Sequence, residues 1–330
     1  MNEMIKATRQ KTIGRELLIA LPVFAILFLA PLFAGTYHTR LLTKFILFGM
    51  FAMSLDLIWG YAGILSFGHA AYFGLGAYAV TLILSHVKIA GTLLAVLGSV
   101  ALPVIVGLFM SFFLIYGKVS GVYFSIITLV VTLIMEQLSV AWYTVTGGLD
   151  GFFPVPPFNL FGYQLDADSN NGLMIYFYIV AIAAAIVFAG LYLLSKSRYG
   201  LILQAMKNDP QRTQFMGINI ATARTIVFTL SCGIAGLAGG LMGPLEDFIS
   251  PSLFSLLLST QVMIWVAVGG RNTLIGPFFG AILLGYLQAF LSGIIVEAWY
   301  LVIGIILVVV VIFWPDGLAG ALMKKRARRA

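Results

Sequence analysis

Charged residues are scarce in this chain. Only 9% of its 330 residues are Asp, Glu, Lys or Arg, and 61% are hydrophobic, whereas water-soluble domains average about 25% charged residues. Apolar runs recur along the whole length, and each is long enough to cross the hydrocarbon core of a bilayer as a helix. The composition therefore excludes a soluble protein, and the length of the runs excludes the short alternating strands of a membrane β-barrel.

Motifs for catalysis and metal binding are also missing. No phosphate-binding loop of the form G-x-x-x-x-G-K-[ST] occurs, so the chain is not expected to hydrolyse ATP by itself. Its three histidines, His38, His69 and His86, lie far apart, and its single cysteine, Cys232, cannot form an intrachain disulfide. We expect no catalytic residue, no metal and no cofactor bound by this chain.

The apolar runs and the residues that interrupt them predict an all-α, polytopic membrane protein with about ten transmembrane helices. Residues 17–320 are expected to form one transmembrane domain. The predicted spans are 17–35, 45–60, 70–86, 91–115, 119–141, 173–194, 225–243, 256–270, 274–295 and 298–314.

The few charges are distributed asymmetrically between the predicted loops. If the N-terminus is cytoplasmic, most of the 19 basic residues fall in cytoplasmic segments, including residues 1–16 and the basic tail 321–330. This bias follows the positive-inside rule, places both termini in the cytoplasm, and explains the net charge of +7 without a nucleic-acid partner. The outer segments would hold Arg40, Lys44, Lys88, Asp150, Asp166, Asp168, Glu246, Asp247 and Glu297.

Two predicted spans are interrupted by glycines, at residues 60–79 and 268–285. Such segments are typical of broken helices, whose irregular backbone faces protein or a water-filled cavity. They occupy loosely corresponding places in the two halves of the chain, which suggests an internal repeat.

Polar residues inside the predicted spans are candidates for a translocation path, because charge within a bilayer is costly. Asp56 lies toward the cytoplasmic end of its span, and Glu136 lies toward the outer end of its span. The distance between them argues against a catalytic pair. Either side chain could instead hydrogen-bond to a neighbouring helix. His69 lies at a glycine-rich break, where a histidine most often caps or bridges freed backbone groups rather than contacting the solute. The full set of candidates is Asp56, Ser66, Phe67, His69, Tyr72 and Glu136.

A polar, basic-rich insert at residues 195–224 separates two spans. Its apolar spacing predicts a short amphipathic helix, and Asp209-Pro210 predicts a break or restart of that helix. The insert could lie on the membrane surface, attracted to anionic lipid by Lys207 and Arg212. Alternatively, it could be a coupling helix that docks on a separate ATPase.

Five blocks of sequence, spread over residues 54–320, resemble the permease subunits of branched-chain amino acid ABC importers. The related urea and short-chain amide importers share this architecture. The blocks are SLDLIWGYAGILSFGHAAYFGLGAY, VTGGLDGF, SRYGLILQAMKNDPQRTQFMGINI, WVAVGGRNTLIGP and FWPDGLAG.

The resemblance implies a subunit of the bacterial inner membrane. Its partners would be a second homologous permease, two cytoplasmic ATPases that use ATP and Mg, and a periplasmic solute-binding protein, for which residues 145–172 form a plausible docking ledge. The coupling residues would be Tyr199, Gly200, Leu201, Ala205, Asn208, Asp209, Arg212 and Gly217.

The chain departs from the family pattern at four positions. Gln204 stands where arginine is frequent, Thr213 and Gln214 stand where alanine is common, and Asp56 stands where relatives commonly carry asparagine. The alternative to an ATP-driven importer is a secondary transporter or channel driven by an ion gradient, which the scarcity of intramembrane carboxylates disfavours.

Overall fold

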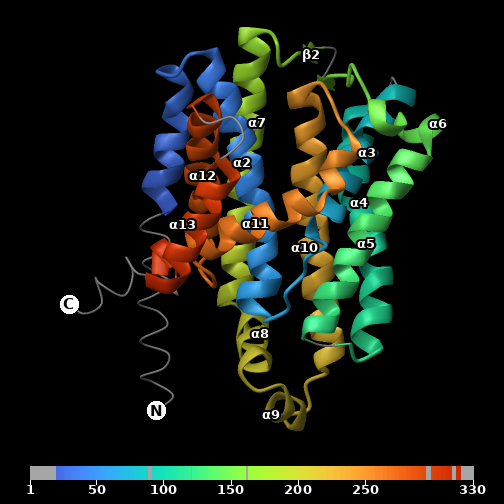
Figure 1. Ribbon diagram of the computed structural model, residues 1–330, viewed down its shortest axis with the longest axis vertical. Coiled ribbons are helices and arrows are strands. Elements are labelled where there is room, and N and C mark those ends of the chain that lie inside the picture. Colours follow the sequence, from blue (N-terminus) through green and yellow to red (C-terminus); the bar gives the residue numbers. More distant parts are fainter. Residues whose placement is uncertain are drawn as a thin grey trace.

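The computed structural model describes residues 20–87, 91–119, 121–160, 163–294, 299–313 and 317–320. Most helices run along the long axis of the molecule (Figure 1), and the fold is all-α apart from one small hairpin. The predicted N-terminal segment 1–16, the basic tail 321–330, Lys88 and Glu297 lie outside the described residues.

Each of the ten predicted spans lies largely on a helix, and the all-α, polytopic membrane fold is confirmed. In the described part of the chain, six helices are long and apolar enough to cross a membrane. The apolar helices are Ala20–Leu32, α2 (Thr36–Asp56), α3 (His69–His86), α4 (Gly91–Ser111), α5 (Val122–Ala141), α7 (Asn170–Lys196), α10 (Ile220–Glu246), α11 (Leu256–Gly269), α12 (Ile275–Ile294) and α13 (Trp299–Phe313). π-Helical turns at 57–61 and 112–116 extend α2 and α4 respectively.

Helix α2 begins earlier than the sequence predicts, at Thr36 rather than near residue 45. Arg40 and Lys44 interrupt the apolar run, but each forms an ion pair, with Asp168 and Glu246 respectively. Because their charges are neutralised at the end of the bundle, the helix continues through them.

The two glycine-interrupted segments are both broken, as predicted. After α2 and its π-helical turn, residues 62–68 are irregular and α3 starts at His69. Between α11 and α12, Gly270 and Asn272 have φ angles of 119° and 66°, conformations in which a helix cannot continue. In Figure 1, α11 lies across the molecule near its middle rather than along the long axis. The internal repeat stays a prediction.

Helices α3 and α10 approach each other closely through glycines. A Cβ atom on Gly76 would collide with the backbone of Gly236, and one on Gly239 would collide with the carbonyl of Phe73. Such contacts let helix backbones pack directly inside a membrane, where the hydrophobic effect does not hold helices together.

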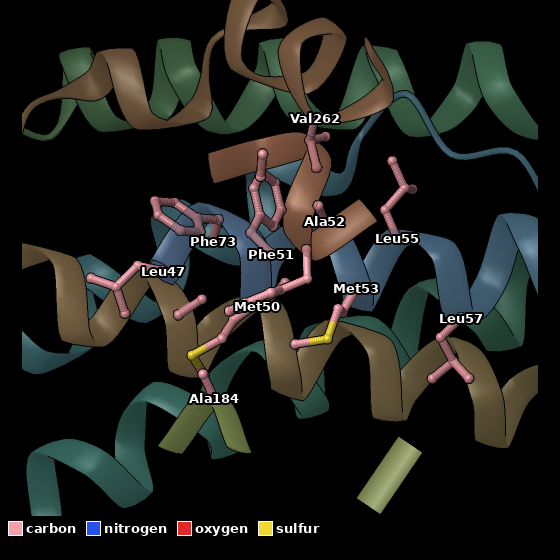
Figure 2. Close-up of a cluster of buried hydrophobic side chains, with 14 of the residues drawn as sticks. Leu47, Met50, Phe51, Ala52, Met53, Leu55, Leu57, Phe73, Ala184 and Val262 are labelled. Atoms are coloured by element: carbon pink, nitrogen blue, oxygen red, sulfur yellow. The ribbon is translucent and has the colours of Figure 1, made fainter. Parts of the chain in front are cut away.

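The core is centred on α2. Its side chains Met50, Phe51 and Met53 are fully buried and lie among residues of other helices, including Phe73 of α3 and Val262 of α11 (Figure 2). A helix buried on nearly all sides lies in the interior of the bundle rather than against lipid.

The two ends of the bundle differ. At the hairpin end, strands β1 (Phe158–Leu160) and β2 (Tyr163–Leu165) pair antiparallel and contact α4 and α7 respectively, and the short helix α6 (Tyr143–Thr146) lies at the same end. At the opposite end, helices α8 (Arg198–Asn208) and α9 (Pro210–Phe215) project below the other helices (Figure 1). We call these the hairpin end and the α8–α9 end.

Candidate coupling segment and translocation path

The polar insert forms two consecutive helices, as its sequence predicts. The Ser197 side chain accepts a hydrogen bond from the backbone N–H of Gly200 at 3.3 Å and so caps α8. Asp209 caps α9 in the same way, accepting from the N–H of Arg212 at 3.0 Å, while Pro210 occupies the first turn. Both caps satisfy N–H groups that a helix start leaves unpaired.

Four of the predicted coupling residues hold the shape of this segment. The Tyr199 hydroxyl donates to the carbonyl of Ala223 at 2.6 Å, which fastens α8 to α10. Gly200 packs so closely against the carbonyl of Ser195 that a larger residue would collide with it. Arg212 and Asp209 form an ion pair at 2.8 Å.

The other four predicted coupling residues are on the surface. Leu201 is 48% exposed, and Ala205 and Asn208 are exposed too. Gly217 has φ +82° with open space around its α-carbon, so it serves as a turn.

Two prominent residues of this segment were missed by the sequence interpretation. Phe215 is 91% exposed and Met216 is 76% exposed, at the C-terminal end of α9. Two consecutive large apolar residues in an otherwise polar insert were the available signal. Exposed side chains of this kind mark a protein or membrane interaction site.

The six candidate path residues lie in different surroundings. Ser66, His69 and Tyr72 are at most 2% exposed, whereas Phe67 and Glu136 are partly exposed on different segments. Asp56 is fully buried at the α8–α9 end, where its Oδ1 accepts from the backbone N–H of Asn272 at 2.9 Å.

His69 joins three helices. Its Nε2 lies 2.8 Å from the Ser54 hydroxyl of α2 and 3.3 Å from the Ser231 hydroxyl of α10. Each hydroxyl donates its own proton to a backbone carbonyl, so each accepts from His69, which requires a proton on Nε2. The ring also stacks on Phe51, with an interplanar angle of 4°. The geometry is that of a bridge within the core.

A cavity of about 280 Å³ opens at the α8–α9 end, lined by residues that include Gly63, Ile115, Ser125 and Arg224. None of the six path candidates lines it. No group of three or more His, Cys, Asp or Glu residues is placed to hold a metal ion within the described ranges.

Comparison with known proteins places this arrangement in a family. Residues 37–311 match the family described as branched-chain amino acid transport system / permease component. The chain belongs to this family. It is a permease and not an enzyme, and its resemblance to branched-chain amino acid permeases is confirmed.

Relatives of this permease carry related descriptions. The high-affinity branched-chain amino acid transport system permease protein LivM of Escherichia coli is 25% identical, over 96% of this chain and 77% of its own. A probable branched-chain amino acid transport permease protein LivH of Methanocaldococcus jannaschii is 29% identical over 52% of this chain and 53% of its own. The fructose import permease protein FrcC of Rhizobium meliloti is 28% identical over 42% and 41% respectively. No solved structure matches.

Proposed function

We propose that this permease is the membrane subunit of an ATP-driven importer in the bacterial inner membrane, and that α8 and α9 dock on a cytoplasmic ATPase. The observation that carries the proposal is the projecting α8–α9 segment with Phe215 and Met216 exposed at its tip. A chain without a phosphate-binding loop needs an external source of energy for active transport.

The proposed orientation puts the α8–α9 end in the cytoplasm, together with both termini. The hairpin end would then face the periplasm, and residues 145–172 would receive a solute-binding protein. The distribution of basic residues supports this orientation.

A second, homologous permease is the proposed partner within the membrane. Relatives named LivM and LivH both match this chain, which is what two permeases of common origin in one system would produce. Two ATPase subunits, one for each permease, would complete the complex, and they would bind the ATP and Mg.

Branched-chain amino acids are the proposed solute, because the full-length relative LivM carries that description. Urea and short-chain amides are the alternatives, suggested by the block at residues 265–277. The partial match to a fructose permease indicates that the shared fold does not fix the solute.

The test is co-expression with the neighbouring transport genes, followed by purification and reconstitution in proteoliposomes. We expect ATPase subunits to co-purify and uptake of leucine to require ATP and the binding protein, with urea and a short amide assayed in parallel. ATP-independent uptake by the permease alone, driven by an imposed ion gradient, would instead establish the secondary transporter or channel.

Replacing both Ala205 and Gly217 with bulky residues tests the docking face. Ala205 is exposed and Gly217 has open space around it, so neither change fills a packed core. A side chain at Gly217, with φ +82°, also strains the turn, so the Ala205 change is measured alone as well. Uptake is expected to fall while membrane insertion persists; unchanged uptake would contradict the docking assignment.

A further inference from the structure

The α8–α9 end of α2 is in contact with two other segments. The Lys207 ammonium of α8 donates to the carbonyl of Gly60, in the π-helical turn that ends α2. One helical turn earlier, the Asp56 carboxylate accepts from the backbone N–H of Asn272, in the turn between α11 and α12. One helix end thus joins the projecting segment to both glycine-interrupted segments.

These contacts leave little free space. A Cβ atom on Gly60 would collide with the Asp56 carboxylate and lie 2.7 Å from the Asn272 nitrogen. At Gly63, a Cβ atom would meet the Lys207 side chain at 3.0 Å. Neither segment can shift by more than a small amount without displacing its neighbour.

The charged form of the Asp56 carboxylate needs nearby hydrogen-bond donors and cations to stabilise it. A carboxylate at the C-terminal end of a helix is disfavoured by the helix dipole, and Asp56 is also fully buried. Lys207 interacts with the charge of Asp56, and Arg271, whose guanidinium stacks over Trp59 at 4.9 Å, interacts with Lys207 in turn. Burial lowers the pKa of Lys207, Asp56 raises it in opposition, and Arg271 lowers it further.

We propose that Asp56, Gly60, Lys207 and Asn272 form a junction that transmits movement of α8 to the 62–68 and 270–274 segments, and that Asp56 is a positioning residue for transport rather than a solute contact. This inference rests on the proposed function, because it takes α8 to be moved by an ATPase. If α8 withdraws, the Asp56 carboxylate and the Gly60 carbonyl lose Lys207. The contacts of Lys207 then no longer stabilise the present positions of the 62–68 and 270–274 segments.

The junction is suited to repeated breaking. Asp56 is buried, but Lys207, Arg271 and Asn272 are exposed, so water can replace the lysine when α8 moves. A contact between two fully buried charges would be far more costly to open.

The experiment measures coupling in the complete reconstituted complex, as solute taken up per ATP hydrolysed. Lys207→Met removes the cation from an exposed position, and Asp56→Asn removes the charge while keeping an oxygen that can accept from Asn272. Each is expected to lower coupling about three- to tenfold with the ATPase rate retained. The double variant is expected to be no worse than either single one, because both break one junction.

Two controls separate this role from a structural one. Lys207→Arg keeps a cation that can reach the Gly60 carbonyl and should restore most coupling. Lys196→Met removes a lysine that stacks on Tyr192 of its own helix, and should be neutral.

The outcomes distinguish the two levels of proposal. If the unaltered complex shows no ATP-dependent uptake, the proposed function fails and the junction proposal with it. If the unaltered complex transports but Lys207→Met and Asp56→Asn leave coupling unchanged, or if their effects add, only the junction is overturned.

Discussion

The two ends of α2 satisfy their charges in different ways. At the hairpin end, Arg40 pairs with Asp168 at 2.7 Å and Lys44 pairs with Glu246 at 3.0 Å. At the α8–α9 end, Asp56 is buried and its neighbouring cations lie at the surface. The first arrangement fixes one set of segments, whereas the second leaves a contact that an external protein can reach.

The two ends of the molecule also differ in their backbone hydrogen bonds. At the hairpin end, Phe152 and Ile249 exchange two backbone hydrogen bonds of 2.8 and 3.2 Å, and the Asp247 carboxylate accepts from the N–H of Val155 at 2.9 Å. The loop is thereby attached to the segment that follows α10. At the other end, α9 carries exposed apolar residues at its tip. The loop at the hairpin end is thus held by backbone hydrogen bonds, whereas the α8–α9 end carries Phe215 and Met216 exposed on a short helix.

The largest expected effect comes from making the α9 tip polar. Phe215→Glu combined with Met216→Glu should weaken association with the ATPase about 30-fold or more, because buried aromatic anchors dominate interface energies. Pull-down of the ATPase and ATP-dependent uptake would measure this effect.

The matched control for that change lies at the hairpin end. Phe153 is 74% exposed, so Phe153→Glu also introduces charge at an exposed aromatic position. It should leave ATPase association unchanged. Equal loss of ATPase binding in both variants would remove the functional distinction between the ends.

The next largest effect is expected at His69, which bridges three helices in the core between the two ends. His69→Ala removes the bridge to Ser54 and Ser231 and leaves a cavity beside Phe51, which should lower stability by about 2 to 3 kcal/mol. Thermal unfolding in detergent would measure it. His86 is exposed and bonds to the carbonyl of Leu82 in its own helix at 2.8 Å, so His86→Ala should change stability by less than about 0.5 kcal/mol. Equal effects would contradict a bridging role.

The sequence predicted the fold well because local signals determine most of it. Apolar runs predicted the helices, glycines predicted both broken segments, and Asp209-Pro210 predicted the division between α8 and α9. The start of α2 was misplaced, because the charges of Arg40 and Lys44 are neutralised by residues far away in the chain.

The candidate site was less predictable for the same reason. Lys207 was interpreted as a possible lipid contact, but its ammonium bonds to Gly60, which no local pattern indicates. The buried position of Asp56 next to Asn272 also depends on how α11 and α12 pack. For His69 the sequence suggested a bond to backbone groups freed at the helix break, whereas its Nε2 lies against the Ser54 and Ser231 hydroxyls of two other helices.

A smaller effect is expected from the ion pairs at the hairpin end. Arg40 pairs with Asp168 and also donates to the carbonyl of Leu245 at 2.8 Å, so Arg40→Met should cost about 1 to 1.5 kcal/mol. Lys44→Met loses one ion pair, whose side chains are 32% and 33% exposed, and no further bond to a carbonyl, so it should cost about 0.5 kcal/mol. Added salt should reduce both differences.

The same variants separate stability from coupling. Arg40→Met is expected to lower the melting temperature without changing solute uptake per ATP, which is the reverse of Lys207→Met. Reduced coupling in Arg40→Met at a temperature where it stays folded would show that the hairpin end also transmits movement.

Another small effect concerns the bond that fastens α8 to α10. Burial raises the pKa of the half-buried Tyr199 to about 12, so its hydroxyl donates to Ala223 throughout the neutral range. Tyr199→Phe should cost at most about 1 kcal/mol. A raised pKa stabilises the fold fully below the unfolded pKa, near 10, and this contribution is lost as the pH rises toward 12. The melting temperature of the Phe variant should therefore fall less steeply above pH 10 than that of the unaltered protein. Parallel curves would show that the Tyr199 bond contributes little to holding α8 in place, and that the junction at Lys207 acts without it.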